Sequence, residues 1–109
     1  MSLDDAVQQY FFISGKVNAV ILPMGNISAS ECPVALAAIQ TFIDDMKATQ
    51  WPASASAQLA ELISANEYDL FVQDAKCRYP DQATADAARI RETNAVFAWR
   101  QAIGAPTDF

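Results

Sequence analysis

The chain contains no histidine among its 109 residues. Histidine is the only side chain whose unperturbed pKa lies near neutrality, so its absence removes the usual general base, the usual proton shuttle and the commonest nitrogen ligand for metals. The sequence also carries no motif that names a reaction. We therefore expect a protein that is not an enzyme and that uses no metal or other cofactor.

Basic residues are scarce too, because seven Lys and Arg stand against thirteen Asp and Glu, for a net charge of −6. Residues 1–75 hold nine acidic and two basic side chains, whereas residues 76–109 hold four acidic and five basic ones. Nucleic acids and anionic membranes attract clustered Lys and Arg, so neither is an expected partner. Apolar runs are far shorter than the roughly 20 residues that span a bilayer, and the start of the chain has no basic stretch typical of a signal peptide.

Only two cysteines are present, Cys32 and Cys77. Their wide spacing matches neither a zinc site nor a redox pair, and one bond would not make a disulfide framework. We therefore expect both side chains to serve in packing, in a protein of the reducing cytoplasm. The alternatives are a reactive thiolate at a helix start for Cys32, and for Cys77 a thiol whose pKa is lowered by its basic neighbours.

Alanine occurs 21 times and glycine only three times, which favours helix outside a few turn signals. Those signals divide the chain into four segments at Pro23–Gly25, Trp51–Pro52, Tyr79–Pro80 and Gly104–Pro106. A chain of this length makes one domain. The prediction is a single all-α domain over residues 1–109, a compact bundle of four or five helices.

The pattern of the first segment is compatible with two secondary structures. Apolar residues between Leu3 and Met24 recur at spacings of three and four, as one face of a helix requires. The same stretch is rich in aromatic and β-branched residues, so an α+β fold with an N-terminal hairpin over residues 9–22, packed on helices, is the alternative. Helix is favoured, because a lone hairpin is marginal unless something covers it.

The other segments carry clearer boundary signals. A second helix is expected to begin at Ser28 with Glu31 as a capping box, or at Ser30 with a proline in the first turn, and to end near Thr49. Residues 52–79 change apolar phase, which predicts two short helices with a break at Ala65–Asn66. The last helix is expected to run from Asp81 as its cap to Gly104 as its stop.

Two pairs of residues are candidates for binding a partner. Phe11 and Phe12 lie beside the main apolar stripe of the first helix and extend its apolar arc, which could anchor a second chain. Asp44 and Asp45 lie toward the C-terminal end of their helix, where the helix dipole disfavours negative charge. These features, with the low charged fraction of 18%, predict a homodimer and a basic protein partner on the first two helices.

A third pair is a candidate for binding a small ligand. Arg89 and Arg100 are eleven residues apart, which returns to the same face of a helix, and could hold a carboxylate or a phosphate. The carboxylates, including Asp69 and Glu92, are expected on solvated helix faces. The function expected first is a small acidic interaction module of the adaptor, immunity or inhibitor type. The alternative is a small-ligand-binding protein with an apolar pocket between helices.

Overall fold

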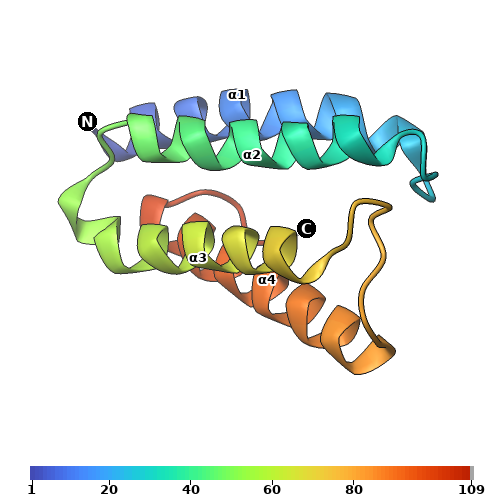
Figure 1. The fold of residues 1–109 in the computed structure, drawn as a ribbon. Helices are drawn as coiled ribbons and strands as arrows, with labels where there is room; N and C mark the ends of the chain where they lie inside the picture. Colours follow the sequence, from blue (N-terminus) through green and yellow to red (C-terminus); the bar gives the residue numbers. More distant parts are fainter. Residues whose placement is uncertain (109) are drawn as a thin grey trace.

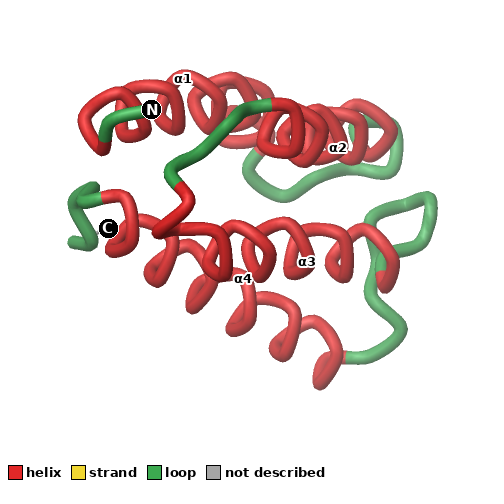
Figure 2. The backbone as a smooth tube through the Cα atoms, turned by 90° about the vertical axis from the view of Figure 1, so that its left-hand side faces the viewer, coloured by secondary structure: helices red, strands yellow, loops and turns green. Residues whose placement is uncertain are grey.

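The computed structural model describes residues 1–108, which form an all-α bundle (Figure 1). Within these residues the helices are α1 (Leu3–Ile21), α2 (Cys32–Ala48), α3 (Ser56–Val72) and α4 (Gln82–Ile103), with short 3₁₀ turns η1 (Leu22–Met24) and η2 (Ala53–Ala55). Helices α1 and α2 lie side by side in one layer, and α3 and α4 form a second layer against it (Figures 1 and 2). The all-α prediction is confirmed.

The first segment is one helix, so the hairpin alternative for residues 9–22 is wrong. The hydroxyl of Ser2 accepts a hydrogen bond from the Asp5 amide at 3.1 Å and caps the helix start. One face then buries Ala6, Tyr10 and Ile13 against the other helices. Helix wins here because its 3.6-residue period places these side chains on the one face that the bundle covers.

The Ser28–Glu31 pair forms, but α2 starts later than predicted: its N-cap is Glu31, and neither Ser28 nor Ser30 caps the helix. The Glu31 carboxylate accepts from the Ser28 amide at 3.0 Å, and the Ser28 hydroxyl accepts from the Glu31 amide at 3.3 Å, as in a capping box. The helix proper begins at Cys32, with Pro33 in its first turn. It ends at Ala48, which confirms the predicted end near Thr49.

Helix α3 is continuous, so the predicted break at Ala65–Asn66 is wrong. The Asn66 side-chain amide donates to the backbone carbonyl four residues earlier at 2.8 Å, which keeps this residue within the helix. Ser64 and Glu67 have the three-residue spacing of a capping box but cap no helix; they bond to Arg91 and to a lysine of α2. The apolar phase changes because α3 packs against both α2 and α4.

Helix α4 has both predicted ends. The Asp81 carboxylate accepts from the Thr84 amide at 2.7 Å, and the bond holds the pKa of Asp81 below its usual value. Gly104 stops the helix with a φ of 80°, a left-handed conformation that glycine adopts at no steric cost.

The apolar core lies toward the end of the bundle where α2 connects to α3. Trp99 is fully buried there, and its ring meets those of Trp51 and Tyr10 edge to face, with centres 5.0 Å and 6.0 Å apart. The Trp51 indole donates to the Met46 carbonyl at 2.8 Å. We call this region, built around Trp99, the closed end. At the opposite end of the layers, where η1 and the α3–α4 loop lie, packing is incomplete.

Candidate functional site

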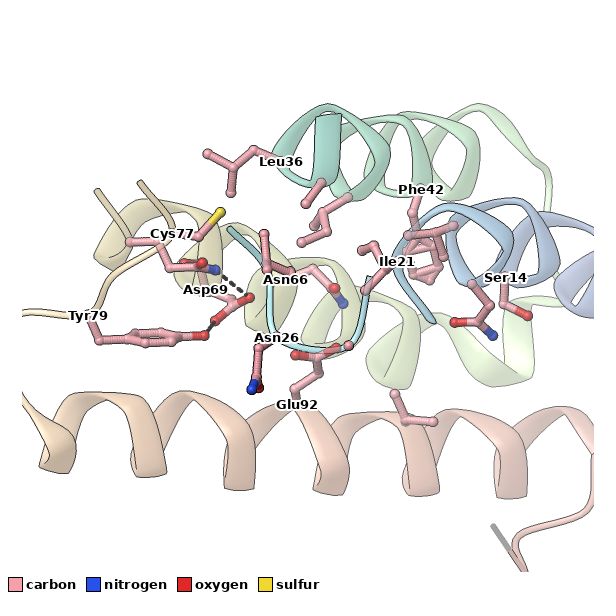
Figure 3. Close-up of a pocket in the computed structure, with 18 of the residues that line it drawn as sticks. Ser14, Ile21, Asn26, Leu36, Phe42, Asn66, Asp69, Cys77, Tyr79 and Glu92 are labelled. Carbon is pink, nitrogen blue, oxygen red and sulfur yellow. Dashed lines mark hydrogen bonds between the residues drawn. The ribbon is translucent and has the colours of Figure 1, made fainter. Parts of the chain in front are cut away.

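A pocket of about 540 Å³ opens between the two layers (Figure 3). It extends from the middle of the bundle toward the end that carries η1 and the loop between α3 and α4. We call this end of the molecule the open end. Pockets that hold small molecules span roughly 300–1,000 Å³, so the volume suits a ligand of modest size.

The wall formed by α1 and α2 is mainly apolar. Ser14 and Asn18 are its polar members, and its aliphatic and aromatic side chains are Tyr10, Val17, Ile21, Ala35, Leu36, Ile39 and Phe42. The apolar residues lie at helical spacing on their helices, so one apolar stripe of each helix lines the pocket.

The wall formed by α3 carries a buried carboxylate. Asp69 is 7% exposed, and its two oxygens accept one hydrogen bond each, from the Tyr79 hydroxyl at 2.5 Å and from the Gln73 amide at 3.0 Å. Figure 3 shows the Tyr79 hydroxyl pointing at this carboxylate. Burial raises the pKa of Asp69, while the two hydrogen bonds act in the opposite direction. Burial and the neighbouring carboxylate likewise raise the pKa of Tyr79.

A second carboxylate enters the same space from α4. Glu92 is partly buried, and Figure 3 shows it rising from α4 toward the region of Asp69. Burial is the main cause that raises the pKa of Glu92, and the nearby charge of Asp69 raises it further. The expectation that these carboxylates lie on solvated helix faces is wrong for both residues, because α3 and α4 turn them toward the layer of α1 and α2.

The two arginines proposed for ligand binding are separated by the fold. Arg100 lines the pocket, with its Cζ atom 5.1 Å from the centre of the Phe11 ring and 5.8 Å from that of Tyr10. Arg89 is not among the residues that line the pocket; it is exposed and lies 3.8 Å from Asp86. The two share a helix face, but α4 diverges from the α1–α2 layer toward its start, so only Arg100 is covered (Figure 1).

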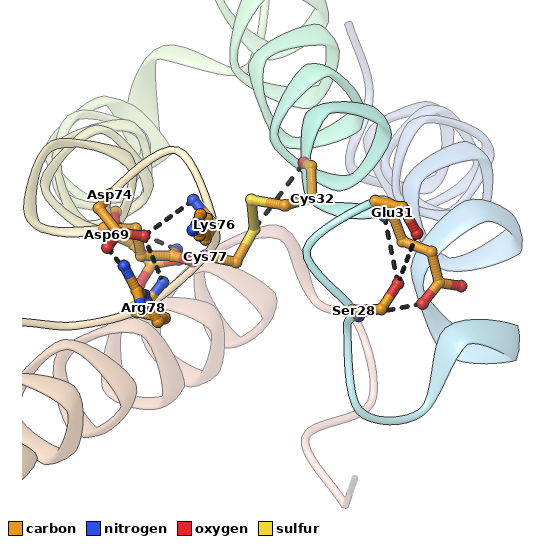
Figure 4. The surroundings of a disulfide bond; sticks show 10 residues. Ser28, Glu31, Cys32, Asp69, Asp74, Lys76, Cys77 and Arg78 are labelled. Carbon is orange, nitrogen blue, oxygen red and sulfur yellow. Dashed lines mark hydrogen bonds and ion pairs between the residues drawn. A yellow bond between two sulfur atoms is a disulfide. The ribbon is translucent and has the colours of Figure 1, made fainter.

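A disulfide joins Cys32 to Cys77 at the rim of the pocket (Figure 4). The prediction that the two cysteines are separate packing residues is wrong, because the fold brings the start of α2 to the α3–α4 loop. The loop is ordered by Asp74, which accepts hydrogen bonds from the Lys76 and Arg78 amides at 2.8 Å and 3.0 Å. These bonds, chiefly that from Arg78, lower the pKa of Asp74. Cys77 itself has a φ of 59° and lines the pocket.

The residues proposed for binding a partner lie on the surface of α1 and α2. Phe11 and Phe12 are 39% and 63% exposed. Asp45 forms an ion pair of 2.6 Å with Lys16 of α1, whereas Asp44 accepts a hydrogen bond from a glutamine of its own helix. The two carboxylates therefore have different partners within the chain and do not act as one charged unit.

Sequence reasoning missed Asp69 and Glu92 as members of one site. A weak signal existed, since Glu92 belongs to the polar stripe that runs along α4 between Arg89 and Arg100. Nothing in the sequence placed the two carboxylates together, because they come from different helices.

The described residues contain no group of three or more His, Cys, Asp or Glu side chains that could hold a metal ion. Likewise, none of the helices in residues 1–108 is long and apolar enough to cross a membrane. Comparison of the chain with protein-family models, with curated proteins and with solved structures finds no match. The pocket residues themselves must therefore carry any proposal about function.

Proposed function

We propose that the protein is a non-enzymatic small-molecule-binding protein whose ligand occupies the pocket between its two helical layers. The observation that carries the proposal is the cavity of about 540 Å³ with an apolar wall and a few polar groups on the other side. Small-molecule sites combine these two features, because the apolar wall supplies affinity and the polar groups orient the ligand.

The burial of the polar groups supports this proposal. Asn66 and Asp69 are 6% and 7% exposed, although polar side chains are usually found at the surface. Keeping a carboxylate out of water costs stability unless hydrogen bonds compensate for it. A chain that needed only a stable bundle would be better served by apolar side chains here.

Binding of Nile red, a neutral apolar fluorophore, tests the proposal. The expected result is a rise in fluorescence with saturation, and loss of that rise in Leu36→Trp, which fills the pocket from its apolar wall. Val34→Trp is the matched control, because Val34 lies on the same helix but is 55% exposed and does not line the pocket. Equal fluorescence of the two variants would show that the dye binds elsewhere.

The second candidate function is the interaction module expected from the sequence, a homodimer that also binds a basic protein. The exposure of Phe12, and of Leu3 at 47% on the same helix, favours a covered apolar surface on α1. The basic partner has weaker support, since it would compete with Lys16 for Asp45. Light scattering at several micromolar concentrations tests the dimer.

The disulfide bears on where the protein works. Disulfides persist in oxidising compartments and are rare in the reducing cytoplasm. The bond between Cys32 and Cys77 therefore favours an oxidising compartment over the cytoplasm expected from the sequence. Trapping free thiols with an alkylating reagent during cell lysis tests this: protection of both cysteines would support the oxidising compartment, and labelling of both would support the cytoplasm.

A further inference from the structure

The pocket contains a carboxyl group that the chain itself leaves without a partner. Glu92 accepts no hydrogen bond and forms no ion pair with the residues that the structure describes, although it is partly buried and lines the pocket. Its oxygens remain accessible from the pocket, so a ligand there can supply the hydrogen-bond donors that the chain does not.

Asp69 offers further hydrogen-bond acceptor positions in the same region of the pocket. Each of its oxygens accepts one hydrogen bond, yet a carboxylate offers about four acceptor positions, so it can accept from a ligand as well. The bonds from Tyr79 and Gln73 also fix its orientation. The region between Glu92 and Asp69 therefore combines a free acceptor with a preorganised one.

The charges around this region favour a cation. The one guanidinium that lines the pocket belongs to Arg100, which is eight residues from Glu92 on α4, about 12 Å along the helix. Arg100 lies against the rings of Tyr10 and Phe11 rather than near the carboxylates. A metal ion is less favoured, because the described residues bring no third His, Cys, Asp or Glu side chain to the pair.

The wall formed by α1 and α2 determines which ligand body fits the pocket. Val17, Leu36 and Ile39 line the pocket from α1 and α2 with apolar side chains, and Ser14 and Asn18 add polar groups on α1. A ligand that is charged at one end and mainly apolar along its body matches the two walls.

We propose that the pocket binds an organic cation with an apolar body, a protonated amine on a short alkyl or arylalkyl chain, with its ammonium group between Glu92 and Asp69. This inference rests on the proposed small-molecule-binding function and names the class of ligand. The ammonium donates hydrogen bonds to both carboxylates, and the body packs on the wall formed by α1 and α2.

Three compounds with one skeleton test the inference by isothermal titration calorimetry: phenylbutylamine, phenylbutanol and phenylbutyrate. The amine should bind at least about tenfold more tightly than the alcohol, because hydrogen bonds between charged groups in a partly dry site are worth more than neutral ones. The carboxylate should bind most weakly. Glu92→Gln should reduce the affinity for the amine by about tenfold and leave that for the alcohol unchanged.

Two controls separate the possible failures. Glu61→Gln removes a carboxylate from the outer surface of α3 and should leave the affinity for the amine unchanged. If Nile red binds in the pocket but the three compounds bind equally, or none of them binds, the cation inference is wrong while the proposed function stands. Tightest binding of phenylbutyrate, lost in Arg100→Gln, would also overturn it. If Nile red does not bind in the pocket, the proposed small-molecule-binding function is wrong.

Discussion

The two ends of the bundle are built differently. At the closed end, Trp99 is fully buried and contacts the rings of Trp51 and Tyr10, so the layers meet through apolar side chains. At the open end the layers are separated by the pocket, and the groups between them include Asp69 and Glu92. A disulfide holds this end together where apolar packing does not. The contrast indicates that apolar packing is concentrated at one end, while the other end carries the pocket in which we propose that a ligand binds.

The closed end should be the more sensitive to loss of a side chain. Trp99→Ala removes the largest buried side chain and is expected to lower the free energy of unfolding by about 3–5 kcal/mol. Urea unfolding followed by circular dichroism measures the change. Phe97→Ala is the matched control on the same helix, because Phe97 is 46% exposed and its loss should cost far less. Similar losses in the two variants would contradict the assignment of the core to this end.

Removal of the disulfide should act on the open end. The bond closes a loop of 45 residues in sequence separation, for which the chain-entropy account gives about 4 kcal/mol, within the measured range of about 2–5 kcal/mol. The double variant Cys32→Ala, Cys77→Ala should therefore lose stability on that scale. Hydrogen exchange should accelerate first in residues 73–80, while the near-ultraviolet signal of Trp99 at the closed end persists. Simultaneous loss of the exchange protection of residues 73–80 and of the near-ultraviolet signal of Trp99 would show that the two ends do not open independently.

This contrast between the ends also shows what the sequence could predict. The helix ends at Asp81 and Gly104 and the helical first segment follow from short-range patterns, and the structure agrees with them. The disulfide and the pocket depend on which helices lie next to each other, which no short-range pattern encodes. Arg89 and Arg100 make the point together, because periodicity placed them on one face but only the second is covered by α1.

Neutralising Glu92, one of the two carboxylates at the open end, should make the protein more stable at neutral pH. The pKa of Glu92 is raised in the folded chain, so its contribution to stability is present below its usual value of 4.5 and is lost as the pH rises through the folded pKa. Asp69 and Tyr79 face the same region, so the difference between Glu92→Gln and the parent protein reports Glu92 together with its interaction with these two groups. This difference should be near zero at about pH 4 and favour the variant at neutral pH.

The matched variant for this test is Glu61→Gln. Arg91 donates hydrogen bonds to Glu61 and lowers its pKa, so the stability that Glu61 contributes is present above its usual pKa and is lost as the pH falls. Glu61→Gln should therefore be less stable than the parent protein at neutral pH, and the difference should shrink in acid. Thermal unfolding across this pH range measures both variants. A change of the same sign in both would contradict the assignment of Glu92 to a costly buried site.

The smallest effect on stability is expected for the outer face of α1, which belongs to neither end. Phe12 is 63% exposed and its ring lies 5.3 Å from the Lys16 ammonium, so Phe12→Ser should change the free energy of unfolding by no more than about 0.5 kcal/mol. If this face forms the predicted homodimer, light scattering should give the dimer mass for the parent protein and a lower mass for the variant. If the parent protein is monomeric across micromolar concentrations, the homodimer prediction is wrong. The ligand pocket would then be the remaining candidate for a binding function, because it is built from both layers of a single chain.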